Sequence, residues 1–118
     1  MNKPKKQGTQ FETWLCKELS TYPGIVAERL AEGGSHDVGD IRVTTHSVGT
    51  WIVEAKARAN LNVHQTLAAA RHKAGHDPAV VIWKKLVRKD GSQRRVTDGE
   101  PIVVAMTLDD FIGFINWT

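Results

Sequence analysis

The sequence predicts an α/β domain with a mixed central sheet flanked by helices, and three observations lead to this prediction. Helical and strand-like apolar patterns follow one another in the order α-β-β-β-α-β, then a basic hairpin, a strand and a helix. The chain has 118 residues, which is enough for one hydrophobic core. Hydrophobic residues make up 41% and charged residues 25%, an ordinary globular composition. We therefore expect a single domain over residues 9–118, preceded by a flexible basic arm over residues 1–8.

The first helix is predicted from Thr9, because apolar side chains then recur at helical spacing until Tyr22-Pro23-Gly24 ends the pattern. Thr9 and Glu12 also match a capping box, in which the glutamate folds back on the helix start. A structural role for Glu12 and a role in a functional site are both open at this point.

Three strand patterns follow, over residues 25–30, 40–45 and 50–57. A loop with paired glycines separates the first from the second, and a short connection makes the last two a hairpin. With a three-residue loop, Asp40 would lie directly opposite Glu54, whereas a loop of two or four residues would shift that pairing by one. The two carboxylates lie close together in every version.

A second helix comes next and ends near Gly75. Its buried stripe is predicted to consist of Val63, Leu67, Ala70 and Ala74. The apolar run over residues 79–83 has the length of a buried strand. A last strand over residues 102–106 leads to a helix over residues 108–117, capped by Thr107. Because that helix is apolar around most of its circumference, we expect a partner subunit to cover part of it, in a homodimer.

Charged residues inside the hairpin strands point to chemistry. Alternate residues of a strand face the same side, so Glu54 and Lys56 project together while Val53 and Ala55 face the other way. Charges in so apolar a strand are costly unless they are used or paired. Together with Asp40, Glu54 could bind a hard divalent cation such as Mg²⁺, and Lys56 could orient a nucleophilic water or neutralise phosphate charge.

These residues carry a resemblance to a known family. Asp40, a hairpin and then Glu54-Ala55-Lys56 resemble the core of the PD-(D/E)xK nuclease superfamily. The segment Gly8-Thr9-Gln10-Phe11-Glu12 resembles the first-helix glutamate motif of its Holliday-junction resolvase branch. Gly39 stands where the superfamily name has proline, at a position that is tolerant in the family. The resemblance covers most of the chain, residues 8–85.

The resemblance implies a restriction-endonuclease-like core (αβββαβ) and a metal-dependent, structure-specific endonuclease that hydrolyses phosphodiester bonds in branched DNA during recombination and repair. Carried over residue by residue, Asp40 and Glu54 would be metal ligands, with the Ala55 carbonyl as an added ligand. Lys56 would be the catalytic lysine, and Glu12 would support the metal shell directly or through water. The expected ion is Mg²⁺, with Mn²⁺ as a substitute.

Basic and polar residues are expected to contact the DNA backbone, which positions a protein on DNA without specifying sequence. They lie in the N-terminal arm, the glycine loop, the second helix and the basic hairpin: Lys5, Lys6, Ser35, Gln65, Arg71, Lys84, Lys85, Arg88, Lys89, Arg94 and Arg95. The net charge is +3, and the remaining surface would be more positive if the acids bind metal. Basic hairpins also blunt sheet edges, so the hairpin alone leaves both roles open.

The N-terminal residues are polar and basic and do not resemble a signal peptide, and no apolar run approaches the roughly 20 residues that span a bilayer. Cys16 is the only cysteine, so no internal disulfide can form. We therefore expect a soluble protein of the reducing cytoplasm, without membrane contact.

Three alternatives stay open beside a resolvase. Another nuclease of the same superfamily, such as an exonuclease or a restriction-like enzyme, would share every catalytic residue. A non-catalytic DNA-binding module would share the basic surface without needing the acids. His72 and His76 have the i, i+4 spacing of a helical zinc pair and would suit a zinc hydrolase, although a basic helix face is the better account of them. That face consists of Arg71, His72, Lys73 and His76.

Overall fold

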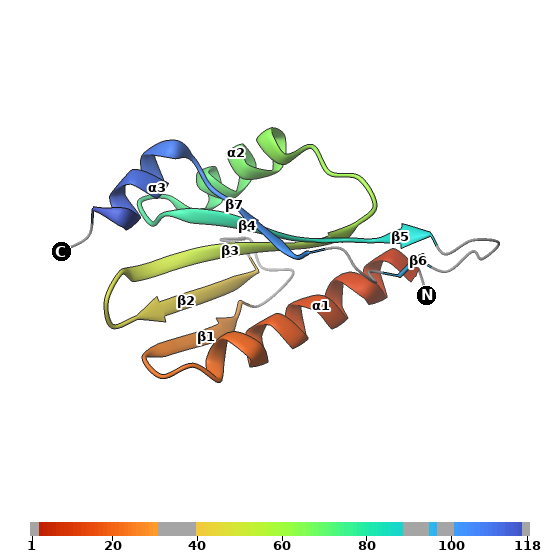
Figure 1. The fold of residues 1–118 in the computed structure, drawn as a ribbon, viewed down its shortest axis with the longest axis horizontal. Coiled ribbons are helices and arrows are strands. Elements are labelled where there is room, and N and C mark those ends of the chain that lie inside the picture. The colour runs from red at the N-terminus through yellow and green to blue at the C-terminus, as the bar shows by residue number, and fades with distance from the viewer. Residues whose placement is uncertain (1–2, 31–39, 89–94, 97–100, 117–118) are drawn as a thin grey trace.

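A five-stranded mixed sheet with helices on both faces forms the body of the protein (Figure 1). The computed structural model describes residues 3–30, 40–88, 95–96 and 101–116. The helices are α1 (Lys3–Ser20), α2 (Val63–Ala74) and α3 (Leu108–Ile115). The strands are β1 (Ile25–Arg29), β2 (Ile41–Thr45), β3 (Gly49–Arg58), β4 (Ala79–Lys85), β5 (Val87–Arg88), β6 (Arg95–Val96) and β7 (Val103–Ala105).

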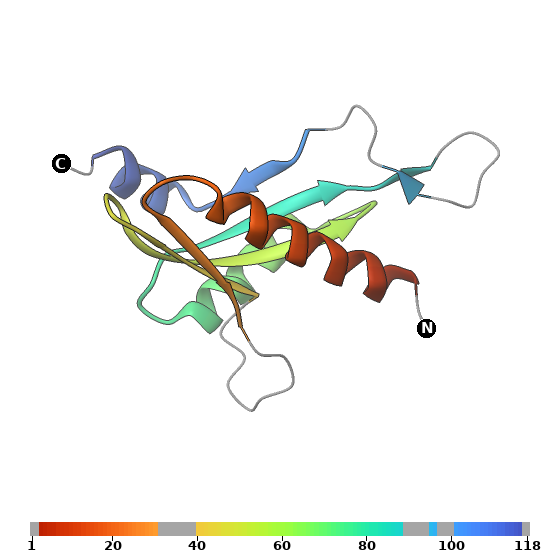
Figure 2. The same cartoon turned by 90° about the horizontal axis from the view of Figure 1, so that it is seen from below.

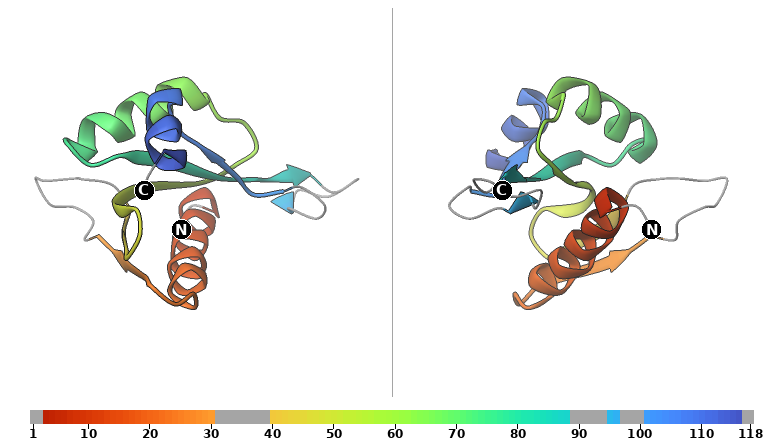
Figure 3. Two further views of the ribbon diagram at one scale, coloured as in Figure 1. Left: turned by 60° about the vertical axis from the view of Figure 1, so that its left-hand side comes forward. Right: turned by 90° about the vertical axis from the view of Figure 1, so that its right-hand side faces the viewer.

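The sheet has the strand order β1-β2-β3-β4-β7. Neighbouring pairs are antiparallel except β3 and β4, which are parallel because α2 carries the chain back between them. Helix α1 covers one face, whereas α2 and α3 lie over the other (Figures 1 and 3). The predicted class, α/β with a mixed sheet flanked by helices, is confirmed.

The alternation of side chains along β3 divides the core between these two faces. Val53, Ala55 and Ala57 are buried in the cluster that also contains Phe11 and Leu15 of α1. On the opposite face, a smaller cluster joins Ala70 of α2 to Ala79 and Val81 of β4. Glu54 and Lys56 alternate with the first set, so they point toward α2 rather than α1. The predicted facing of the charged pair is therefore confirmed.

Helix α1 begins at Lys3, six residues before the predicted start, so residues 3–8 are helical rather than a flexible arm. Proline is tolerated in a first helical turn, and lysine and glutamine are good helix formers, so the segment Lys3–Gln7 extends the helix. Thr9 and Glu12 consequently lie inside the helix. The predicted capping box is wrong, which removes the purely structural role considered for Glu12.

Most other boundaries agree with the sequence pattern. Asn62 caps α2, accepting the N–H of Gln65 at 3.0 Å, and Thr107 caps α3 as predicted, accepting the N–H of Asp110 at 3.1 Å. The basic hairpin is confirmed as the two-stranded β5–β6 ribbon, with Val87 opposite Val96. The ribbon extends from the body at the end where α1 begins (Figure 2). Among the described segments, no helix is long and apolar enough to cross a membrane.

Candidate active site

The β2–β3 hairpin brings the first two carboxylates together. Thr45 pairs with Gly49, so the turn has three residues, and Gly49 adopts the positive φ (80°) that glycine allows. In this register Ile41 lies opposite Val53, and Asp40 and Glu54 follow directly beyond that pair. The three-residue alternative is thus the correct one, and it places the carboxylates side by side at the end of β2.

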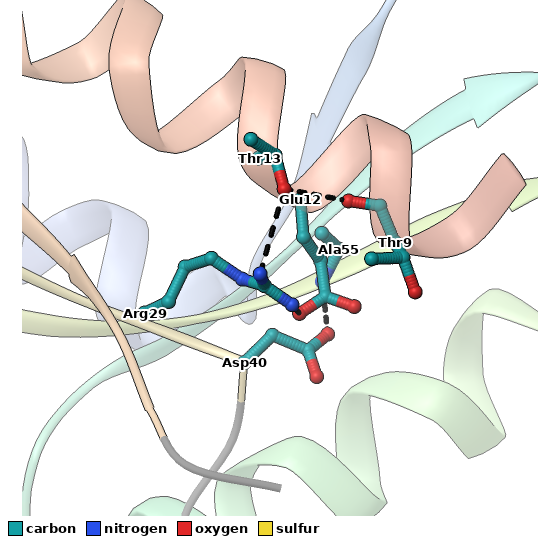
Figure 4. Close-up of polar contacts among 6 residues, drawn as sticks. All are labelled: Thr9, Glu12, Thr13, Arg29, Asp40 and Ala55. Carbon is teal, nitrogen blue, oxygen red and sulfur yellow. Dashed lines mark hydrogen bonds and ion pairs between the residues drawn. The ribbon is translucent and has the colours of Figure 1, made fainter. Parts of the chain in front are cut away.

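Asp40 is held by the backbone of β3. Its N–H donates to the carbonyl oxygen of Val53 at 3.1 Å. Its Oδ2 accepts the N–H of Ala55 at 2.8 Å, a bond drawn in Figure 4. The N–H and C=O of one strand residue point to the same edge of the strand. The Ala55 carbonyl therefore points to the edge where Asp40 lies, as required of the additional oxygen ligand.

Glu54 is a buried acid, with only 5% of its surface exposed. Its Oε1 lies 3.4 Å from Nζ of Lys56 on the same strand and 3.5 Å from Nζ of Lys73 on α2. Its Oε2 is buried and has no hydrogen-bond partner. A buried carboxylate oxygen without a partner is costly, so this atom is available to a cation.

Helix α1 supplies the third acid. Glu12 is 8% exposed, and its Oε1 lies 3.5 Å from Arg29 of β1, which also donates to Oγ1 of Thr13 at 3.4 Å. In Figure 4 the Glu12 carboxylate points toward that of Asp40. The site thus combines three acids with three bases, Arg29, Lys56 and Lys73.

The environment of Asp40 favours its neutral form. Burial raises the pKa of the Asp40 carboxyl from its ordinary 3.8 to about 7, and the negative charges of Glu54 and Glu12 act in the same direction. The hydrogen bond from Ala55 and the charge of Lys56 lower the pKa without offsetting this rise. Near neutral pH the Asp40 carboxyl is therefore partly protonated, and a bound cation would favour its ionised form.

These groups fit a hard divalent cation that takes few protein ligands. In the described parts of the chain, no group of three or more His, Cys, Asp or Glu side chains is arranged to hold a metal ion, so Glu12 does not complete a three-acid cage. Mg²⁺ commonly uses one or two carboxylates and fills its other positions with water and substrate phosphate. Asp40, the Oε2 of Glu54 and the Ala55 carbonyl match that requirement.

Arg29 and Lys73 are the site residues that the sequence analysis missed. Arg29 ends an edge strand, and its alignment with Glu12 depends on how α1 packs on β1. From the sequence, Lys73 was predicted only as a member of the basic face of the second helix, with Arg71, His72 and His76. A signal for its inward position was present, because Lys73 lies three residues after Ala70, which is 1% exposed.

The residues predicted to contact DNA are spread more widely over the chain than the acids and bases of the site. Gln65 and Lys85 are exposed, whereas the Nε of Arg71 lies 3.8 Å from Oδ2 of Asp110, and Nζ of Lys84 lies 5.8 Å from the ring centre of Phe11. Arg88 and Arg95 pair in the β5–β6 ribbon and Lys5 and Lys6 lie in α1, but their side chains are outside the described part. Ser35, Lys89 and Arg94 lie outside the described residues.

A cavity of 780 Å³ lies away from the acids, between the β2–β3 turn, the end of α2 and α3. Trp51 and Phe114 form part of its wall, with ring centres 6.1 Å apart, and His72 and His76 also line it. None of the three site acids is among its lining residues. The cluster of charges and this cavity are therefore separate features of the structure.

Comparison with known proteins adds no assignment to this geometry: no family model matches the sequence, and no curated protein matches it significantly.

Proposed function

We propose that the protein is a metal-dependent, structure-specific DNA endonuclease that hydrolyses phosphodiester bonds in branched DNA, like a Holliday-junction resolvase. The observation that carries the proposal is the buried, unpartnered Oε2 of Glu54 beside Asp40 and the Ala55 backbone, with Lys56 3.4 Å from the other Glu54 oxygen. The order α1-β1-β2-β3-α2-β4 supports a restriction-endonuclease-like core for this site.

In this mechanism, Asp40, Glu54 and the Ala55 carbonyl would hold Mg²⁺, which would supply Lewis-acid activation of a water and of the scissile phosphate. Lys56 would turn from Glu54 to orient the attacking water and to offset the charge that develops on the phosphate. Glu12, restrained by Arg29, supports the hydration shell from the α1 side. The low exposure of both glutamates keeps bulk water from competing for these groups.

The distribution of positive charge supports DNA as the proposed partner. The β5–β6 ribbon carries basic residues on both strands and extends from the body at the end where α1 begins (Figure 2). Such groups contact phosphates and select a substrate by its shape rather than its sequence. We therefore propose branched duplex DNA as the preferred substrate.

A homodimer is proposed from an uncovered apolar surface on β7 and α3. Eight large apolar side chains between residues 102 and 115 are exposed by 41–71%. They are Ile102, Val103, Val104, Leu108, Phe111, Ile112, Phe114 and Ile115. With roughly 150–200 Å² for each fully exposed side chain, their exposed area is about 700 Å², close to the roughly 800 Å² per partner of a stable interface. A second copy related by a two-fold axis would cover this surface.

A substitution on this surface tests the dimer. Leu108→Glu places a charge on a side chain that is 71% exposed, so it should produce monomers without disturbing the core. Val26→Glu, at a site on β1 that is 65% exposed, is the matched control and should leave the dimer intact. Light scattering that finds the parent protein monomeric at micromolar concentration would refute the dimer.

The activity is tested by cleavage of a four-way junction, its linear arms and single-stranded DNA, each with and without Mg²⁺. We expect Mg²⁺-dependent cutting of the junction in preference to the arms, and no cutting by Lys56→Ala. Equal cutting of junction and arms would favour an exonuclease or restriction-like enzyme. Binding without cleavage under every metal condition would favour the non-catalytic DNA-binding module.

A further inference from the structure

Two lysine ammonium groups approach the single carboxylate of Glu54. Lys56 and Lys73 approach the same oxygen, Oε1, at 3.4 and 3.5 Å, so their Nζ atoms lie at most 6.9 Å apart (3.4 + 3.5). The side chain of Lys73 is 31% exposed and that of Lys56 is 24% exposed, so solvent only partly screens their mutual repulsion. One of the two ammonium groups can therefore leave without stripping Glu54 of its countercharge.

The two lysines differ in how firmly they are placed. Lys73 extends from α2, which packs on the sheet through Ala70 at 1% exposure, so its backbone is fixed by the core. Lys56 lies on β3 beside Glu54, and the proposed reaction requires it to turn toward the water and the phosphate. Removing one partner of a buried ion pair is strongly unfavourable when no other countercharge remains. When Lys56 turns away, Lys73 remains as the countercharge of Glu54.

We propose that Lys73 is a positioning residue of the nuclease site, an inference that rests on the proposed function. It keeps Glu54 oriented and charge-compensated, and this leaves Lys56 available for the reaction. A residue in this role would act through Glu54 and not contact the phosphate, so removal of Lys73 should slow the chemical step and leave DNA affinity unchanged.

Three variants test this assignment on the full chain. Lys73→Met retains the length of the side chain without its charge, Lys73→Arg restores the charge, and Lys17→Met removes the charge of an exposed lysine on α1 outside the site. For each we would measure kcat and KM for junction cleavage, the salt dependence of DNA binding, and Mg²⁺ affinity from thermal stability without DNA.

We expect Lys73→Met to lower kcat about 10- to 100-fold, with KM and the salt dependence unchanged. Mg²⁺ should bind Lys73→Met at least as tightly as the parent, because a positive charge near the ligands is removed. Lys73→Arg should recover most of kcat, and Lys17→Met should match the parent. The double variant Lys56→Met/Lys73→Met should be no slower than Lys56→Met, because both residues serve one step.

Two results would overturn the role of Lys73 and leave the proposed function standing. The first is that the parent cleaves DNA and Lys73→Met has the same kcat. The second is a raised KM with a weaker salt dependence, which would identify a phosphate contact. If Lys73→Met does not fold, kcat and KM of Lys73→Gln and Lys73→Arg are compared in the same way to test the role of Lys73. A parent that cleaves no DNA with Mg²⁺ would overturn the proposed function and this inference together.

Discussion

Asp40→Asn should stabilise the folded protein while weakening its metal site. The pKa of Asp40 is raised from 3.8 to about 7, so the folded state disfavours the ionised carboxylate. The difference of about three pKa units corresponds to roughly 4 kcal/mol, which we reduce to about 2 kcal/mol because Asp40 is partly exposed to solvent. Asparagine can still accept the N–H of Ala55, so the change removes the charge and retains the hydrogen bond.

The sign of the pH dependence follows from linkage. Because the folded pKa is the higher one, the folded state binds the proton more tightly, and its stabilisation is complete below pH 3.8. It is lost between pH 3.8 and about 7, as the unfolded chain ionises while the folded chain does not. The advantage of Asp40→Asn should therefore be near zero at pH 4, grow through this window and stay constant above it.

Urea denaturation of the parent and of Asp40→Asn across this pH range measures the effect, with exposed Asp77→Asn as the control. Asp77→Asn should change the free energy of unfolding by less than about 0.5 kcal/mol. Saturating Mg²⁺ should stabilise the parent by RT ln(1 + [Mg²⁺]/Kd), about 2.7 kcal/mol at 100 times Kd, and stabilise Asp40→Asn much less. An Asp40→Asn protein that is less stable than the parent at pH 8 would refute the argument that burial and the neighbouring acids disfavour the ionised Asp40.

The remaining predictions concern catalysis, DNA binding and the core. Lys56→Ala should reduce cleavage on the order of 10²-fold or more while DNA binding and the melting temperature are retained, and near-parental cleavage in nuclease-free preparations would remove Lys56 from the mechanism. DNA affinity should fall steeply between about 50 and 200 mM salt. Lys85 is exposed, and Lys85→Ala should reduce the slope of log affinity against log salt concentration by about 1. An unchanged slope would exclude Lys85 from the interface. Ile52→Ala, at a side chain that is 2% exposed, should lower the free energy of unfolding by about 2–5 kcal/mol, and a loss below 1 kcal/mol would contradict its place in the core.

The sequence by itself determined the class of fold and the order of its elements. The alternation of side chains in β3 predicted that Glu54 and Lys56 lie on one face of the sheet and Val53 and Ala55 on the other, because a strand has only two faces. The cap of α3 was also predictable, and so was part of the stripe of α2, since both depend on residues a few positions apart. Ala70 is buried and Leu67 and Ala74 pack beside it, whereas Val63 does not join that cluster. The start of α1 was predicted wrongly. Thr9 and Glu12 match a local pattern that is typical of a helix start, but the helix begins at Lys3 and both residues lie inside it.

Only the tertiary structure decided the register of Asp40 and Glu54 and which further charges join them. The turn length, and with it the position of Asp40 opposite Glu54, is selected by the pairing of β2 with β3 rather than by the turn residues alone. Arg29 meets Glu12 because α1 packs across β1, and Lys73 meets Glu54 because α2 lies on the face of the sheet where Glu54 projects. These contacts join residues 17 and 19 positions apart, and local spacing cannot encode them because they depend on how helices dock on the sheet.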